Sequence, residues 1–367
     1  MDTQPVFLTP ADQAEIIESL VEKITALYIF PDLAEQICSN LKQHAENGDY
    51  ASLQEGELFA LALTLHLQEV NHDEHLWVRW HPEPLPADAN VLRTSPEWQA
   101  QRRVEARLEN YGLPKVERLA GNVGYLEIHY FHRPAWGGET AAAAMNFLAN
   151  TQALIIDLRK CTGGYPGMIA LILSYLFGEE PIHLSSIYWR DEDITQQFWS
   201  LPYIPGKRYG DKPVYALTSK VTFSGGEAFA SILQTRHRAT LIGDQTDGGA
   251  HPGASYQIHP HFEAFIPIGR TIDPVTGKDF KGVGVIPDIS IPQEHAFQAA
   301  YALALKAVLA SLGEAPSGPF QALAKEAQNA LRHLALNHTI CPRCGYPNHL
   351  YFVQCKNCAE PLTISAA

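Results

Sequence analysis

The hydrophobic pattern of this chain changes its period near residue 122. From residue 9 to residue 70, apolar residues recur at helical spacing, with Thr9 as an N-cap, Pro10 at the first helical position and Pro31 ending the first helix. After residue 122, short apolar runs such as GYLEI and ALIIDLR alternate with helical stretches. This alternation is typical of an α/β core whose sheet is covered by helices on both faces. We therefore predict a helical N-terminal domain followed by an α/β core.

The rest of the chain extends this plan. Strands are expected at 214–218 and 239–243, followed by a β-rich stretch at 256–268 and a closing helix at about 296–312. The predicted units are a helical domain at 1–92, an α/β core at 93–312, a linker and helix at 313–336, and a zinc ribbon at 337–367.

The charge balance and the apolar runs exclude several classes of partner. The 40 acidic residues outnumber the 27 basic ones, and the net charge of −13 disfavours a general affinity for nucleic acid or anionic lipid. The first residues contain no basic n-region and no apolar h-region, and no run reaches the roughly 18 uncharged apolar residues of a membrane span. We expect a cytoplasmic protein without a membrane partner.

The segment TSKVTFSGGEAF, residues 218–229, places Ser224 where a predicted strand ends and a helix begins. A serine at a helix N-terminus can act as a nucleophile, because the helix dipole and the following N–H groups stabilise an oxyanion. The same serine with Glu227 three residues later is also a capping box, which is a common way to begin a helix. The motif alone leaves both interpretations open.

A second motif, IIDLRKCTGGYPGM at residues 155–168, runs from a buried strand into a glycine-rich turn. Its N–H groups could complete an oxyanion hole at the carboxyl edge of the sheet, or the turn could be purely structural. The third motif, VNHDEHLWV at residues 70–78, offers His75 and His72 as candidate bases. Residue chemistry alone does not choose between these two histidines.

Four blocks in order carry a family resemblance: DLRKCTGG, TFSGGEAF, RATLIGDQTDGGAHP and GVGVIPDISI. They resemble the C-terminal processing (tail-specific) serine peptidase family. Within it, the chain looks closest to the branch of interphotoreceptor retinoid-binding protein, which lacks a PDZ insertion. The resemblance covers roughly residues 10–312 and implies a ClpP/crotonase-like α/β core. It implies that Ser224 is the catalytic serine and His75 the general base, as in tricorn-like members, with Gly225 and either Gly163 or Gly164 forming the oxyanion hole.

The chain also departs from the family pattern at three positions. Gly249 stands where members with a serine–lysine dyad have their lysine, so that mechanism is excluded there. Lys281 stands where the histidine-using branch commonly has a glutamate, and Glu74 where tricorn-like members have a serine. Lys281 itself, if desolvated, is a second-ranked base. Glu74, Asp73 or Asp244 could orient His75 instead, and His251 is expected to line the cleft or pack its loop.

Two C-x-x-C pairs near the C-terminus indicate a metal site. Cys341, Cys344, Cys355 and Cys358 give four thiolates with ten residues between the pairs, which suits one structural, tetrahedral zinc ion in a minimal ribbon. Residues 331–367 carry a net charge of only +2, too little to indicate nucleic-acid binding. The ribbon is expected to dock a protein partner or the catalytic domain. Cys38 and Cys161 stand alone and are expected to be structural.

Two functions therefore remain in view. The first is a serine peptidase that acts on a peptide or protein substrate. The second is a binding or scaffold protein that keeps the fold without efficient turnover and holds a hydrophobic ligand or a protein partner. The resemblance leaves assembly into a homo-oligomer open.

Overall fold

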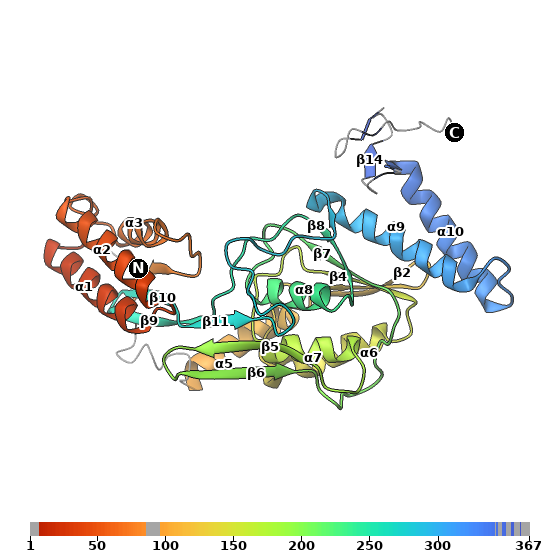
Figure 1. Ribbon diagram of the computed structural model, residues 1–367, viewed down its shortest axis with the longest axis horizontal. Coiled ribbons are helices and arrows are strands. Elements are labelled where there is room, and N and C mark those ends of the chain that lie inside the picture. Colours follow the sequence, from red (N-terminus) through yellow and green to blue (C-terminus); the bar gives the residue numbers. More distant parts are fainter. Residues whose placement is uncertain are drawn as a thin grey trace.

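The computed structural model describes residues 7–85, 96–341, 343, 347–349, 354–355 and 360. Figure 1 shows an elongated molecule, with the N-terminal helices at one end, a sheet-based core in the middle and the C-terminal hairpin at the other end.

Three helices form the N-terminal end of the molecule: α1 (Pro10–Leu27), α2 (Pro31–Glu46) and α3 (Gly56–Gln68). The predicted start of α1 is confirmed, because the Asp12 N–H donates to Thr9 Oγ1 (3.2 Å) and the Thr9 N–H donates to Asp12 Oδ2 (2.8 Å). Both α1 and α2 have a proline in the first turn, where no N–H is needed. The helices therefore begin at positions that the local sequence specifies.

A hairpin from much later in the chain completes this N-terminal layer. Strand β1 (Trp77–Trp80) pairs antiparallel with β10 (Phe262–Pro267), which pairs with β9 (Gly253–His259). The three strands share one apolar core with α1, α2 and α3, and Figure 1 shows β9 and β10 beside these helices. The layer that precedes the α/β core therefore contains strands from both halves of the chain.

Helix α3 buries a different stripe from the one that its leucine spacing indicates. Of the leucines expected to form the buried stripe, Leu58, Leu61 and Leu65 are 48%, 55% and 56% exposed and only Leu67 is buried, whereas Phe59 and Leu63 are fully buried. Both sets recur at helical spacing on a helix that is apolar on most sides.

The central sheet has six strands in the order β12-β8-β7-β4-β3-β2, and only β2 is antiparallel to its neighbour. These strands are β2 (Lys115–Leu119), β3 (Val123–Glu127), β4 (Ala153–Asp157), β7 (Val214–Thr218), β8 (Thr240–Gly243) and β12 (Ile289–Ser290). The α/β core predicted from the alternating pattern is confirmed. Its parallel strands end together at one edge, where the loops after β4 and β7 meet.

Helices cover both faces of this sheet. Leu154 and Ile156 on β4 pack into one core with α6 (Pro134–Leu148), α7 (Pro166–Leu176) and α8 (Gly225–Thr235). Ala153 and Ile155 point to the other face and pack with α9 (Gln293–Leu312) and α10 (Pro319–Asn337). Figure 1 shows α9 and α10 leading away from the core toward the C-terminus.

Smaller elements surround the core. Strands β5 (His183–Trp189), β6 (Ile194–Trp199) and β11 (Gly269–Ile272) form a three-stranded antiparallel sheet in the order β11-β5-β6. Helix α5 (Pro96–Leu108) and the short 3-10 turn η1 (Asn110–Gly112) precede β2.

The C-terminal hairpin pairs β13 (His338–Ile340) with β14 (Pro347–His349). Cys341 and Cys355 are buried in the core that includes α9 and α10. Cys344 and Cys358 lie outside the described residues. The predicted ribbon is therefore described at two of its four cysteines.

Helix α9 is the one helix in the described part of the chain that is long and apolar enough to cross a membrane. It packs against β4, β7 and β8 and against α10, as a core helix of the α/β layer does.

Candidate active site

Ser224 lies at the turn from β7 into α8. Its backbone angles, φ 50° and ψ −116°, fall in a region that residues other than glycine rarely adopt and that is often found at functional sites. The turn is fastened to the loop after β4, because Thr222 Oγ1 donates to Leu158 O (2.8 Å) and the Phe223 N–H donates to Cys161 O (3.0 Å). Neighbouring hydrogen bonds therefore hold this conformation at a partly exposed serine.

Glu227 supports the turn from inside the protein. Its fully buried carboxylate accepts four hydrogen bonds, from Ser224 N–H (2.9 Å), Gly248 N–H (2.7 Å), Gly249 N–H (2.7 Å) and Thr246 Oγ1 (2.5 Å). Burial raises the pKa of Glu227, although these donors oppose the shift. The residue predicted as part of a capping box thus also ties the Ser224 turn to the 246–249 loop.

The glycine turn after β4 lies against the start of α8. A Cβ on Gly225 would come within 2.9 Å of Gly164 N, and one on Gly163 within 3.0 Å of Ser224 Cβ. Phe131 forms a parallel β-bridge with this turn: its N–H donates to Gly163 O (2.8 Å), and its carbonyl accepts from Tyr165 N–H (2.7 Å). The residue between these two, Gly164, therefore has its N–H facing away from Phe131. Among the described residues, neither Gly164 N–H nor Gly225 N–H donates a hydrogen bond to the protein.

Gly163 differs from Gly164, because its own carbonyl accepts from Phe131 N–H (2.8 Å), so Gly163 belongs to the side of the turn that faces Phe131. Gly164 and Gly225 therefore present two free N–H groups beside Ser224, the arrangement that an oxyanion hole requires. This favours Gly164 over Gly163 as the second donor.

His75 lies on the loop between α3 and β1, and its ring stacks on Phe223 with centroids 4.4 Å apart. A Cβ on Gly249 would meet Cε1 of His75 at 2.6 Å and the Phe223 ring at 2.2 Å. His75 therefore fills the space that a side chain at position 249 would need, next to the residue that precedes Ser224. No hydrogen bond joins Ser224 Oγ to His75 among the described residues, and such bonds are often long before substrate binds.

Asp73 lies beneath His75 and is fully buried. Its Oδ2 accepts from Tyr28 Oη (2.8 Å) and lies 3.1 Å from His251 Nδ1. Its Oδ1 lies 3.4 Å from Lys281 Nζ and 3.9 Å from His75 Nδ1. Asp73 is therefore the acidic group that faces His75. Lys281 is a cationic neighbour of the same Asp73 carboxylate.

This environment shifts the pKa values of both groups. Burial lowers the pKa of His75 to about 4, while Asp73 opposes the shift and the charges of His251 and Lys281 add to it. Burial would raise the pKa of Asp73, but the hydrogen bond from His251 and the positive charges of His251, Lys281 and His75 hold it well below its usual range. At neutral pH, His75 is a neutral imidazole beside an ionised carboxylate.

The other candidate partners of His75 lie elsewhere. The exposed side chain of Glu74 faces the carboxyl group of Asp247, and this neighbour together with partial burial raises the pKa of Glu74 to about 7. Asp244 accepts from the Gln293 N–H at the start of α9 (3.2 Å). His251 is 1% exposed and packs its ring edge-on against Phe30, so it belongs to the interior beneath His75.

Sequence reasoning did not identify Tyr28 as a partner of Asp73, nor Phe223 as the platform under His75. The spacing of Asp73 and His75 in D-E-H was a usable signal for their contact, because a carboxylate two residues before a histidine lies on the same loop and can face its ring. Tyr28 gave no such signal, since its contact depends on α1 packing over a distant loop.

Comparisons with known proteins support the family resemblance and the fold. A model of peptidase family S41 matches residues 122–291, and a model of the N-terminal domain of peptidase S41 in eukaryotic IRBP, the interphotoreceptor retinoid-binding protein, matches residues 3–107. The chain therefore contains a peptidase S41 family domain. Its N-terminal layer is of the IRBP-like type, so the resemblance found in the sequence is confirmed.

Two curated relatives are C-terminal processing peptidases. The chain is 26% identical over 191 residues to carboxyl-terminal-processing peptidase 1 of Arabidopsis thaliana chloroplasts, and 25% identical over 178 residues to the carboxyl-terminal-processing protease of Synechocystis. The matches cover 51% and 48% of this chain but only 37% and 39% of the relatives, so the S41 chain spans well under half of their length.

Solved structures share the fold over most of the chain. A lipoprotein from Streptococcus agalactiae aligns with a TM-score of 0.52 at 13% identity, covering 83% of this chain and 99% of its own. A protein from Parabacteroides merdae aligns with a TM-score of 0.53 at 17% identity, covering 80% and 96%. At these identities the likeness supports the mixed α/β fold.

Proposed function

We propose that this S41 protein is a serine-type peptidase that cleaves peptide bonds through Ser224, with His75 as the general base. The observation that most supports this proposal is the contact at Gly249. The serine–lysine members have their lysine at this position, and here the ring of His75 fills the corresponding space. A neutral imidazole can accept a proton there, which a protonated lysine cannot do.

The reaction would proceed through an acyl-enzyme. Ser224 Oγ attacks the peptide carbonyl carbon while its proton passes to Nε2 of His75, and the carbonyl oxygen becomes an oxyanion. The N–H groups of Gly164 and Gly225 stabilise that oxyanion. His75 then returns the proton to the leaving amine as the C–N bond breaks, and water releases the acyl group from Ser224 by the same steps.

Asp73 would stabilise the imidazolium that forms on His75. Its carboxylate lies 3.9 Å from His75 Nδ1, close enough for a strong electrostatic interaction in a buried site. In this assignment Asp73 replaces the glutamate whose place Lys281 occupies. Lys281 instead neutralises part of the Asp73 charge from 3.4 Å.

A serine-directed fluorophosphonate probe tests this proposal. We expect the purified full chain to be labelled, and Ser224→Ala to abolish both labelling and peptide cleavage. Ser231→Ala, on the same helix, is the matched control and should label like the wild type. A folded wild-type protein that does not label, or Ser224→Ala protein that still labels, would contradict the proposal.

The alternative is a protein of the same fold that binds a hydrophobic ligand or a protein partner without efficient turnover. Lys281, in place of an acid and 3.4 Å from Asp73, is the observation that favours it, since it competes for the carboxylate that His75 needs. An unlabelled, folded protein that still binds peptides in a tryptophan-fluorescence titration would support this alternative.

We also propose that Cys341, Cys344, Cys355 and Cys358 bind one structural zinc ion. The two described thiols, on Cys341 and Cys355, are 1% and 3% exposed and belong to one core. Cys355 N–H donates to Glu360 O (2.7 Å), so these two described residues lie together. When bound, the ion would cross-link the two C-x-x-C turns and hold them against α9 and α10. A reducing, cytoplasmic setting suits such thiolates, and the outer face of the ribbon could dock a protein partner.

A further inference from the structure

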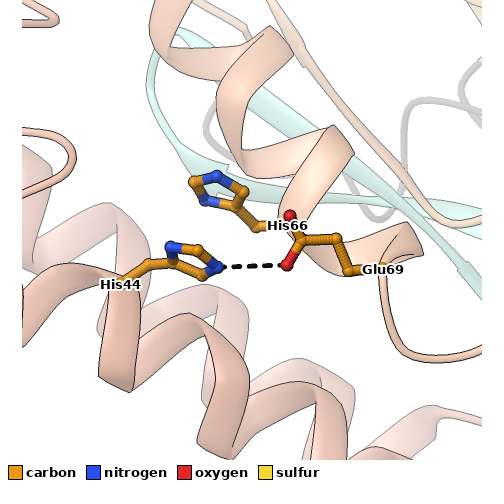
Figure 2. A group of neighbouring side chains, drawn as sticks. All are labelled: His44, His66 and Glu69. Atoms are coloured by element: carbon orange, nitrogen blue, oxygen red, sulfur yellow. Dashed lines mark hydrogen bonds and ion pairs between the residues drawn. The ribbon is translucent and has the colours of Figure 1, made fainter.

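A second group of metal-binding side chains lies in the N-terminal layer, away from the cysteines. His44 comes from the last turn of α2, His66 from the last turn of α3 and Glu69 from the C-cap of α3. Figure 2 shows the two imidazoles one above the other, with the Glu69 carboxylate at the edge of the His44 ring. His66 and Glu69 are three residues apart, which places both on one face of the helix.

The spacing of these atoms is close to that of a metal site. One ligand atom from each of the three residues lies within 4.8 Å of the others, and His44 Nε2 is 3.1 Å from Glu69 Oε2. Ligands about 2.0–2.1 Å from a tetrahedral zinc ion are about 3.3 Å apart, so the His44–Glu69 pair already has that spacing. The two rings stack at 3.6 Å and 7°, so binding would require them to tilt toward a common point.

Each of the two histidines is also held by a partner at its Nδ1 atom, and Glu69 Oε2, which faces His44 Nε2, accepts a second hydrogen bond from Asn40. His44 Nδ1 lies 2.6 Å from Asp49 Oδ2, and His66 Nδ1 lies 2.8 Å from Tyr50 Oη. Asn40 Nδ2 donates to Glu69 Oε2 (3.0 Å). Such partners orient metal-binding histidines and carboxylates in known sites, and here they leave Nε2 of both rings for the ion.

We propose that His44, His66 and Glu69 bind one zinc ion, with water in the remaining position. Two imidazoles suit zinc, and the carboxylates of Glu69 and Asp49 balance its charge. The His44 side chain is 21% exposed and that of Glu69 is 50% exposed, so an ion can reach the site from solvent. The ion would fasten α2 to α3 just before the loop that carries Asp73 and His75. This proposal does not depend on the peptidase function.

Zinc counting on the full chain tests the proposal. After dialysis against buffered Zn²⁺, we expect about two zinc ions per wild-type chain, one at the cysteines and one here. Glu69→Gln and His66→Ala should each bind one ion fewer. Glu46→Gln changes an exposed glutamate at the end of α2 and is the matched control, which should bind as many ions as the wild type. Asp49→Asn should weaken the second ion about 10- to 100-fold.

Two further readouts separate this site from the cysteines. In a Cys341→Ser background, added Zn²⁺ should still raise the Tm, and His66→Ala should remove that rise. Co²⁺ bound here should absorb in the visible range without the near-ultraviolet thiolate band of a cysteine site. Equal zinc content in wild type, Glu69→Gln and His66→Ala would overturn the proposal, and would leave His44 as a histidine bridging two carboxylates.

Discussion

A β-carbon on Gly249 would come within 2.6 Å of Cε1 of His75. These residues come from opposite halves of the chain. The observed position of the His75 ring requires that residue 249 have no side chain. Glycine at position 249 makes room for the imidazole, and the imidazole stacks on Phe223 beside the serine. The space at this point of the site therefore holds either a side chain at position 249 or the His75 ring.

Gly249→Ala tests that relationship. The added methyl group would push His75 or Phe223 out of place, and a shift of about 1 Å in a catalytic group can cost about 100-fold in rate. We expect kcat/KM for a peptide substrate to fall by about that factor or more. Gly178→Ala is the control, since a Cβ there meets nothing within 4 Å. Wild-type activity in Gly249→Ala would show that His75 is not positioned for catalysis.

The pH dependence of activity follows from the lowered pKa of His75. A general base must be neutral, and burial lowers the pKa of His75 to about 4. We therefore expect the acid limb of the kcat/KM profile to have its midpoint near pH 4, whereas an unperturbed histidine would place it near 6.5. A midpoint between pH 6 and 7 would contradict this assignment.

The same shift makes stability depend on pH. Between pH 6.5 and about 4, His75 is protonated in the unfolded chain and neutral in the folded one, so the unfolded state binds more protons. The free energy of unfolding should therefore fall as the pH is lowered through that window, by up to about 3 kcal/mol. Urea unfolding of the wild type at several pH values would measure the slope, and His75→Gln should reduce it.

Lys281→Met distinguishes the two candidate bases. If His75 is the base, the variant stays active, and loss of the Lys281 charge raises the pKa of His75 and moves the acid limb to higher pH. If Lys281 is the base, activity disappears. Lys278→Met, an exposed lysine on the same segment, should leave the pH–rate profile unchanged.

Asp73→Asn should destabilise the protein at neutral pH. The variant removes the negative charge at the centre of a buried network, so Lys281 and His251 lose their carboxylate partner. Removing one partner of a comparable buried pair lowers the free energy of unfolding by about 3–5 kcal/mol. Chemical denaturation at pH 7 would measure the loss, with the exposed Asp191→Asn as control.

The sign of this stability difference can be checked by lowering the pH. The folded-state pKa of Asp73 is lowered, so its contribution is complete above its unfolded value of about 3.9 and is lost as the pH falls further. The gap in unfolding free energy between wild type and Asp73→Asn should therefore narrow below about pH 4. A gap that is the same at pH 3 and pH 7 would show that the charge of Asp73 does not stabilise the fold.

Cys341→Ser should remove the zinc ion bound by the C-terminal thiolates. We expect zinc content to fall by about one ion per chain and the Tm of the C-terminal hairpin to fall with it, because the ion holds the two turns together. Cys38→Ser, at a buried cysteine outside the pairs, is the control for thiol loss. Unchanged zinc content in Cys341→Ser would rule out the cysteine site.

Local signals in the sequence were sufficient to predict much of the fold. Thr9 and Asp12 specify the start of α1 through hydrogen bonds within four residues, and the run at 153–156 is apolar on both faces because helices cover both. Ser224 could be located for the same reason, since its strand, turn and helix are contiguous in the chain.

Contacts between distant segments could not be predicted in this way. The packing of residues 253–267 against α1 and α3 depends on strand pairing with β1, for which one sequence offers no register. On α3, two apolar stripes have helical spacing, and only the position of that sheet decides which one is buried. The contacts of Asp73 could not be predicted for the same reason. They come from three separate segments, which carry Tyr28, His251 and Lys281.

The pairing of β1 with β10 also determines when the layer that carries His75 can be completed during synthesis. A nascent chain that ends at residue 250 already contains Ser224 and His75, but it lacks His251 and the strand that pairs with β1. The layer that carries His75 therefore stays open until residue 267 has left the ribosome. If the chain cleaves peptides as proposed, it would do so only after this late segment has joined the N-terminal layer.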